Sequence, residues 1–181
     1  PTGGARSIPC SSKRRVAYSR FRISRADSPN FLQKVSQLSM IEEILPRIHR
    51  VAVPLPKTPL GNLNCYIIRD SERRLIVDTG FNTPECSRAL LAALHELEVD
   101  PGESDVVLTH MHSDHSGLGY LLEDRGAAVL CHPLDGRVIN AMGEWEEILS
   151  FGYRCGLPEE KLRQARDKHP GYRYRPDRPV D

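Results

Sequence analysis

Four side chains that can bind metal ions are concentrated within six residues of this sequence. They are His110, His112, Asp114 and His115, and the fully apolar segment Val106–Leu108 comes shortly before them. Imidazole and carboxylate groups are the usual ligands of zinc and similar divalent ions. Because alternate residues of an extended segment point the same way, His110 and His112 can share one ion. Asp114 and His115 lie past the turn and can bind a second ion, which predicts a two-metal site at the end of a strand.

The alternative for this segment is a histidine-rich turn on the protein surface. One histidine beside one aspartate would fit that interpretation. Three histidines and an aspartate in the order H-x-H-x-D-H, after an apolar strand, favour metal binding instead. The small residues Ser113, Ser116, Gly117 and Gly119 allow the loop to fold tightly.

Strand and helix patterns alternate around the motif. Strands are predicted at 48–53, 65–68, 75–77, 106–108 and 127–131, with the second and third forming a hairpin and the last one buried. Helices are predicted at 84–97, with Thr83 as the cap, at 118–124, in a segment that ends at 148–151, and at 157–167. Strand, helix and strand in this order predict an α/β fold with stacked layers.

Residues 1–39 and 40–181 differ in charge and in hydrophobic pattern. The first segment has eight Lys or Arg residues against one acid, which leaves 17 basic and 23 acidic residues in the second. We expect 1–39 to be a disordered basic leader; transit peptides share its composition, so organellar targeting stays open. The acidic body argues against nucleic acid as a partner, because phosphate binding needs a clustered basic face. The sequence contains no run of 18 apolar residues, which is about the length that a membrane-spanning helix needs.

The cysteines are odd in number and never form a C-x-x-C pair. They are Cys10, Cys65, Cys86, Cys131 and Cys155. This pattern fits neither a disulfide framework nor a zinc ribbon. We therefore expect buried free thiols in a reducing compartment, which favours a cytoplasmic location.

The motif after a strand resembles the signature of the metallo-β-lactamase superfamily, and the resemblance covers residues 44–135. It implies an αββα sandwich, of which this chain holds the first half. It also implies two bound zinc ions, with iron or manganese as alternatives. His110 and His112 would bind the first ion, and Asp114 and His115 the second.

The resemblance also assigns a role to Asp78, in the sequence Asp78-Thr79-Gly80. Asp78 would match a family aspartate that lies under the site and supports the ligand loop. The other interpretation is that Asp78 is an ordinary turn residue. Family members complete the first metal site with a histidine in a later H-x-x-G-H segment, and a bridging aspartate and a final histidine follow. The later histidines here are His132 and His169. Both are candidates for a further metal ligand. However, His132 lies where the family has a non-ligand residue, and no apolar strand precedes His169, so we expect the chain to end before the second half of the sandwich.

The chemistry implied by the resemblance is hydrolysis by a metal-activated hydroxide. A thioester, a lactone or another activated ester or amide would be the small-molecule substrate, and Asp114 would orient the nucleophile and move a proton. Three alternatives remain: a nuclease of the RNase Z type, an iron-dependent persulfide dioxygenase, and a truncated chain that catalyses nothing. The oligomeric state stays open. His49 and His95 are expected to be structural or solvated, and Trp145 to be a packing residue.

Overall fold

The computed structural model describes residues 40–141 and 144–180, so the expected basic leader at 1–39 lies outside the described residues. The described part is built on one six-stranded sheet whose strands follow the order of the chain. The strands are β1 (Met40–Leu45), β2 (Ile48–Pro54), β3 (Asn62–Arg69), β4 (Arg74–Val77), β5 (Ser104–Val107) and β6 (Ala128–Leu130). Neighbouring strands are antiparallel from β1 to β4 and parallel from β4 to β6. The predicted α/β fold and the β3–β4 hairpin are confirmed.

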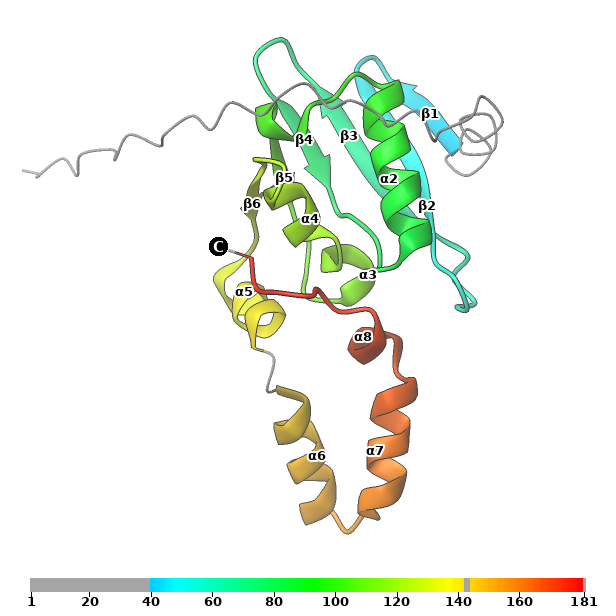
Figure 1. Cartoon of the computed structure of the whole chain (residues 1–181), viewed down its shortest axis with the longest axis vertical. Helices are drawn as coiled ribbons and strands as arrows, with labels where there is room; N and C mark the ends of the chain where they lie inside the picture. Colours follow the sequence, from blue (N-terminus) through cyan, green and yellow to red (C-terminus); the bar gives the residue numbers. More distant parts are fainter. Residues whose placement is uncertain (1–39, 142–143, 181) are drawn as a thin grey trace, which may run out of the picture.

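Helices connect the parallel strands and follow the last one. They are α2 (Pro84–Glu96), α3 (Ser113–Ser116), α4 (Gly119–Glu123), α5 (Pro133–Asn140), α6 (Glu144–Arg154), α7 (Glu159–Lys168) and α8 (Pro170–Arg173), with a 3₁₀ turn at Pro101–Glu103. Both crossovers between parallel strands run in the same direction along the sheet, so right-handed connections place α2 and α4 on the same face (Figure 1). α6 and α7 extend from the rest of the chain as an adjacent pair (Figure 1). Within the described residues, no helix has the length and apolar character needed to cross a bilayer.

The helix predicted at 84–97 forms as α2 because both of its ends and its buried face are specified locally. Thr83 has extended backbone angles, and its side chain accepts a hydrogen bond from the backbone N–H of Cys86 at 3.3 Å. Pro84 occupies the first turn, where a missing N–H costs nothing. Ala89, Leu90, Ala93 and Leu94 form the buried face.

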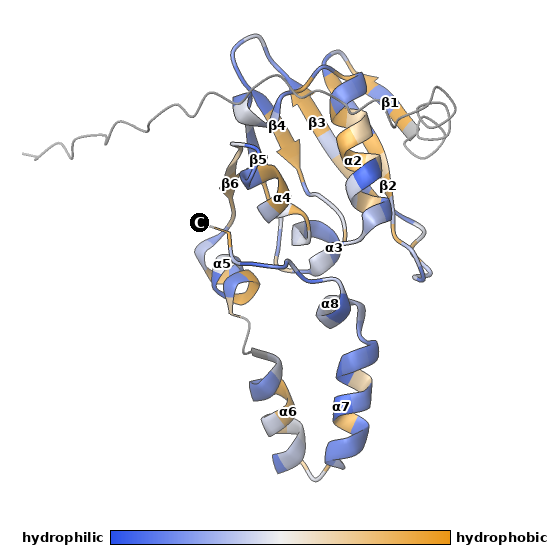
Figure 2. Ribbon diagram, in the orientation of Figure 1, coloured by the Kyte–Doolittle hydropathy of each residue, from blue (hydrophilic) through white to orange (hydrophobic). Residues whose placement is uncertain are grey.

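The core lies between α2 and the sheet. Val51 and Val53 of β2, Ile67 of β3, Ile76 of β4 and Leu90 of α2 have no exposed surface. The hydropathy colouring shows the same distribution, with apolar residues on the strands and on the side of α2 that faces them (Figure 2). This core holds the ends of β4 and β5 in place, and the candidate site lies at these ends.

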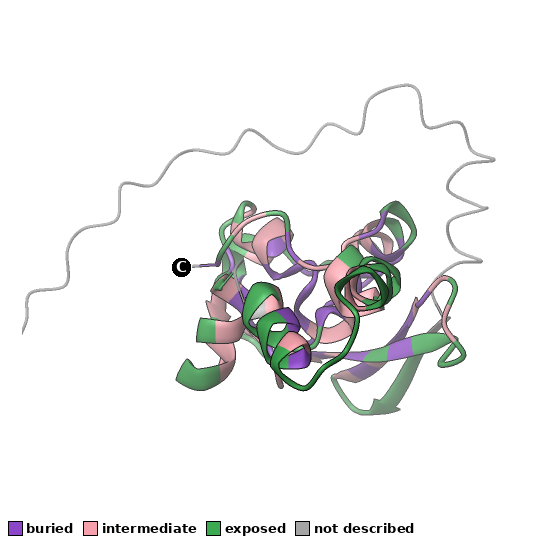
Figure 3. Cartoon of the chain, turned by 90° about the horizontal axis from the view of Figure 1, so that it is seen from below, coloured by how far each residue is buried: buried purple, intermediate pink, exposed green. Residues whose placement is uncertain are grey.

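Several details differ from the sequence-based expectations. The strand predicted as buried at 127–131 is the shorter β6, and both Ala128 and Leu130 are exposed because β6 is the last strand of the sheet and pairs only with β5. β1, α5 and α8 were not predicted. The tight loop expected at the motif contains a one-turn helix, α3. Much of the surface of α6 and α7 is exposed (Figure 3).

The burial of the cysteine thiols agrees only in part with the prediction that they are buried. The described cysteines are free, and Cys65 and Cys86 are buried. Cys155 is exposed and Cys131 is half-buried, so the prediction of buried thiols was wrong for Cys155. Cys155 directly follows α6, which ends at Arg154.

Candidate metal centre

The candidate site lies where the parallel strands β4 and β5 end side by side. Asp78 follows β4, and its backbone N–H donates to the carbonyl of Val107 at 3.0 Å. Leu108 continues β5 and donates to the carbonyl of Leu130 at 2.9 Å. The chain then turns at His110, so the rigid end of the sheet fixes where the motif begins.

Asp78 joins the two strand ends through its carboxylate. Its Oδ1 accepts a hydrogen bond from the backbone N–H of Thr109 at 2.9 Å, and the Thr109 hydroxyl lies 2.9 Å from Oδ2. The Oδ2 atom lies 2.7 Å from Nδ1 of His115. Asp78 is buried and has a φ of 62°, a conformation that Asp adopts more readily than most residues. The aspartate predicted to lie under the ligand loop is therefore in contact with His115.

The pKa shifts of Asp78 and His115 are opposite in direction, and each favours the charged form of its group. Burial alone would raise the pKa of Asp78, but the hydrogen bonds with His115 and Thr109 outweigh it and lower the pKa below its ordinary value. Burial would also lower the pKa of His115, but the hydrogen bond and the charge of Asp78 raise it above the ordinary value. A carboxylate bonded to Nδ1 sets the orientation of a histidine ring and leaves Nε2 available as a donor to a metal.

The four motif side chains meet as two pairs of donor atoms. Nε2 of His110 lies 3.0 Å from Nδ1 of His112, and Nε2 of His115 lies 3.5 Å from Oδ2 of Asp114. The ring centroids of His110 and His115 are 4.1 Å apart, so the pairs adjoin. Two donors that each lie about 2.1 Å from one tetrahedral zinc are roughly 3.4 Å apart. The distance between the two donor atoms of each pair is therefore close to that expected for two atoms bound to the same ion.

The charge state of the His110 ring also suits a metal. Burial, followed by the neighbouring imidazoles of His115 and His112, lowers the pKa of His110 and favours its neutral form. Neutral imidazole is the form that binds metal ions. However, within 40–141 and 144–180 no group of three or more His, Cys, Asp or Glu residues converges in an arrangement that could hold an ion. The residues present fit two donors for each ion, and the assignment of the four side chains as ligands stays a prediction.

His132 and His169 cap helices in this structure. The Nδ1 atom of His132 accepts from the backbone N–H of Leu134 at 3.3 Å, at the start of α5. The Nδ1 atom of His169 accepts from the backbone N–H of Gly171 at 3.1 Å, at the start of α8. These capping bonds engage one nitrogen of each ring, and His169 also lines the cavity that borders His112.

Backbone contacts hold the motif against the turn that follows β4. The N–H and the hydroxyl of Thr79 both donate to the carbonyl of His115, at 2.9 and 2.8 Å. Gly117 approaches this turn so closely that an added Cβ would lie 2.6 Å from the carbonyl oxygen of Gly80 and 2.5 Å from that of Ser113. Only glycine fits there, which explains one of the small residues after the motif.

Sequence reasoning missed two residues that support the motif. Thr109 binds Asp78, and its place between the strand and the first histidine was a local signal that could have identified it. Asp135 of α5 accepts a hydrogen bond from the backbone N–H of Met111 at 3.0 Å. No local pattern reveals that contact, because it joins residues that are 24 positions apart.

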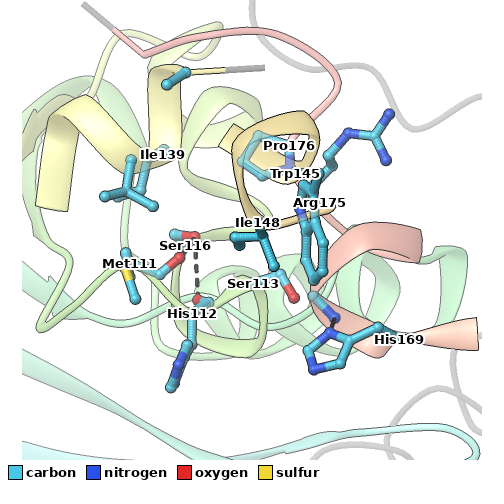
Figure 4. Close-up of a pocket in the computed structure, with 13 residues that line it drawn as sticks. Met111, His112, Ser113, Ser116, Ile139, Trp145, Ile148, His169, Arg175 and Pro176 are labelled. Atoms are coloured by element: carbon cyan, nitrogen blue, oxygen red, sulfur yellow. Dashed lines mark hydrogen bonds between the residues drawn. The ribbon is translucent and has the colours of Figure 1, made fainter. Parts of the chain in front are cut away.

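A cavity of about 220 Å³ opens beside the motif (Figure 4). Segments from α3, α5, α6 and the region of α8 contribute to its wall. The lining residues are Met111, His112, Ser113, Ser116, Val138, Ile139, Ala141, Trp145, Ile148, His169, Gly171, Arg175 and Pro176. Trp145 therefore lines the cavity as well as packing against Tyr172 and His169.

Comparison with known proteins places this chain in a family. The model of the metallo-beta-lactamase superfamily matches residues 58–180. The chain is 39% identical over 87 residues to the atrochrysone carboxyl ACP thioesterase nsrC of Aspergillus novofumigatus, a match that covers 46% of this chain and 26% of the relative. It is 34% identical over 87 residues to the lactamase-like protein GME11357 of Pestalotiopsis microspora, covering 48% of this chain and 27% of the relative.

Solved structures show the same fold. The metallo-beta-lactamase family protein TTHA1429 of Thermus thermophilus superposes with a TM-score of 0.59 at 27% identity. That match covers 77% of this chain and 47% of the other chain. The matched region spans about a quarter of the length of the curated relatives (26% of nsrC).

Proposed function

Because this chain belongs to the metallo-beta-lactamase superfamily, we propose that it carries metal ligands of a metal-dependent hydrolase that acts on thioesters. The observation that carries the proposal is the geometry of the motif. Two pairs of donor atoms adjoin at the ends of β4 and β5, and the carboxylate of Asp78 orients one of the rings.

Each donor pair would hold one divalent ion. His110 and His112 would bind the first ion through Nε2 and Nδ1, and Asp114 and His115 the second through Oδ2 and Nε2. Zinc suits imidazole and carboxylate donors in this combination. When bound, such ions supply Lewis acidity and a water-derived nucleophile near neutral pH.

The protein groups around the ions position the reactants. Asp78 keeps the Nε2 atom of His115 directed toward Asp114, since its hydrogen bond occupies Nδ1. Asp114 would bind the second ion, and its carboxylate would orient the attacking water and accept its proton. The cavity beside His112 gives the acyl part of a substrate access to this position.

The relatives support a thioester as the substrate. The curated protein nsrC is named as a thioesterase that acts on an acyl carrier protein substrate, and a protein of Emericella nidulans that is 37% identical over 86 residues has the same activity in its name. Thioesters are activated acyl compounds, and they suit attack by a metal-activated nucleophile. Lactones and other activated esters share this property.

One observation favours a second candidate, a chain that binds metal weakly and catalyses nothing by itself. The described residues supply two donors for each ion, whereas catalytic zinc sites usually have three protein ligands. Weak, substoichiometric zinc binding together with no hydrolysis by the 181-residue chain would support this second candidate.

Zinc titration and a thioester assay test the proposal on the same protein. Metal-free protein is titrated with zinc in a calorimeter, and hydrolysis of S-benzoyl-N-acetylcysteamine is followed by release of the thiol. His112→Ala is expected to lower the bound zinc and to abolish hydrolysis. His95→Ala is the matched control, because His95 is exposed on α2. Equal zinc binding by wild type and His112→Ala would contradict the proposal.

A further inference from the structure

The cavity beside the motif is lined largely by apolar side chains. Met111 and Ile139 lie on one side and Trp145 on the other, and Ile148 lies between them (Figure 4). These residues come from three separate segments, namely the motif, α5 and α6. An apolar wall assembled from distant segments is typical of a ligand pocket.

Two polar side chains of the wall, Ser116 and Arg175, are bonded to backbone carbonyls of the protein. The hydroxyl of Ser116 donates to the carbonyls of Met111 and His112 at 3.2 and 3.1 Å. The guanidinium of Arg175 points away from the cavity and donates to the carbonyl of Tyr172 (Figure 4). The Ser116 hydroxyl and the Arg175 guanidinium are thus occupied by the protein's own carbonyls, and among the described lining residues the apolar side chains of Met111, Ile139, Trp145 and Ile148 favour an apolar ligand.

Trp145 gives the cavity a fixed aromatic side. Its ring packs edge-on against Tyr172, with centroids 5.6 Å apart and an interplanar angle of 79°. It also contacts the ring of His169 at 5.1 Å. An indole held on two sides offers a ready surface for another ring, and aromatic pairs are favourable beyond the area that they bury.

The size of the cavity limits the ligand. A cavity of about 150 Å³ lined by aliphatic and aromatic side chains takes up benzene. The cavity here measures about 220 Å³, which leaves room for a substituted ring or two fused rings. Its lining includes His112, a proposed metal ligand, so a ligand in the cavity lies next to the candidate metal centre.

From these observations we propose that the cavity binds an aromatic acyl group of one or two rings, and that it selects aromatic thioesters over linear ones. This rests on the proposed function for the identity of the reacting group. Binding of the ring itself needs no metal, since the wall consists of protein side chains. The two proposals can therefore fail separately.

The single tryptophan of the chain reports on this cavity directly. Protein labelled with ¹⁵N is titrated with neutral 2-naphthamide in the presence of EDTA, and the one indole N–H resonance is followed. We expect a saturable shift of this resonance. Octanamide, the linear probe, is expected to bind at least tenfold more weakly.

Two glutamate substitutions on α6 separate cavity binding from a general charge effect. Ile148→Glu places a carboxylate in the cavity wall and is expected to weaken 2-naphthamide binding at least tenfold. Phe151→Glu adds the same charge on the same helix, at a residue that is 63% exposed and does not line the cavity, and it is expected to leave binding within twofold of wild type.

Three results would overturn the proposal: no shift of the indole resonance, equal weakening by both substitutions, or tighter binding of octanamide than of 2-naphthamide. Loss of zinc binding or of thioester hydrolysis bears on the proposed function instead. A saturable indole shift in EDTA would still support the aromatic cavity in that case.

Discussion

Oδ2 of Asp78 and Nδ1 of His115 are 2.7 Å apart, which ties the end of β4 to the last residue of the H-x-H-x-D-H motif. The two residues are 37 positions apart in the chain. The parallel pairing of β4 and β5 brings them together, and the carboxylate then fixes the ring. This relationship makes the geometry of the motif depend on the sheet.

Asp78→Asn is expected to weaken zinc binding by about 10- to 100-fold, the usual effect of losing a group that orients a metal ligand. Asn fits the backbone angles of Asp78, so the change removes charge and one acceptor without altering the turn. The free energy of unfolding should fall by about 1–3 kcal/mol, since a buried partner is lost. Calorimetry with zinc and urea denaturation measure the two effects. Asp70→Asn, on an exposed aspartate, is the control, and equal zinc affinity in both variants would refute the role of Asp78.

Gly117→Ala is expected to destabilise the protein by about 3 kcal/mol or more, because the added methyl group meets backbone atoms that cannot easily move. The contacts are the backbone nitrogen of Asn82 at 2.6 Å and the carbonyl oxygens of Gly80 and Ser113. Gly119→Ala should change stability by less than about 1 kcal/mol, since its nearest contact is the side chain of Leu108 at 3.4 Å. Thermal unfolding of both variants checks the difference, and similar melting temperatures would contradict it.

Thr83→Ala should lower the free energy of unfolding by about 1 kcal/mol, because it removes the side-chain cap of α2. Ser87→Ala, one turn later in the same helix, removes a hydroxyl that donates to the carbonyl of Pro84 and leaves the cap intact. Urea denaturation monitored by circular dichroism compares the two. A larger loss from Ser87→Ala than from Thr83→Ala would show that the cap is not what stabilises the start of α2.

Thiol reactivity should follow burial in the folded protein. Cys155 is exposed, whereas Cys65 and Cys86 are buried, and burial raises the pKa of both buried thiols. In a Cys10→Ser background, Ellman's reagent at about pH 8 should modify Cys155 rapidly and leave Cys65 and Cys86 protected until the protein unfolds. Adding Cys155→Ser should remove the fast phase. Rapid modification of Cys65 without unfolding would contradict the buried position of β3.

The parts of the fold that were predicted from sequence are those with strong local patterns. The apolar spacing and cap of α2 identified that helix to within one residue, and the hairpin of β3 and β4 followed from two apolar runs around a polar turn. Membership of the superfamily is likewise confirmed by the match to residues 58–180. α5 was missed because little of it is buried, and Ile139 is its one buried residue.

The residues of the candidate site also differ in whether a local sequence pattern reveals them. The motif and Asp78 could be found from sequence, because residue types and spacing carry the signal. The support from Asp135 and the wall of the cavity could not, because they depend on how α5, α6 and α8 fold back against the motif. Trp145 was expected to be a packing residue, and only the folded chain shows that it also lines the cavity.

The agreement between strand order and chain order has a consequence for biosynthesis. Each strand pairs with the one made just before it, so the sheet can grow strand by strand while the protein leaves the ribosome. Asp78 is synthesised directly after β4, and its partners Val107 and Thr109 come just before the first histidine of the motif. The histidines of the motif therefore follow their supporting carboxylate in the order of synthesis, with only α2, the 3₁₀ turn and β5 made between them.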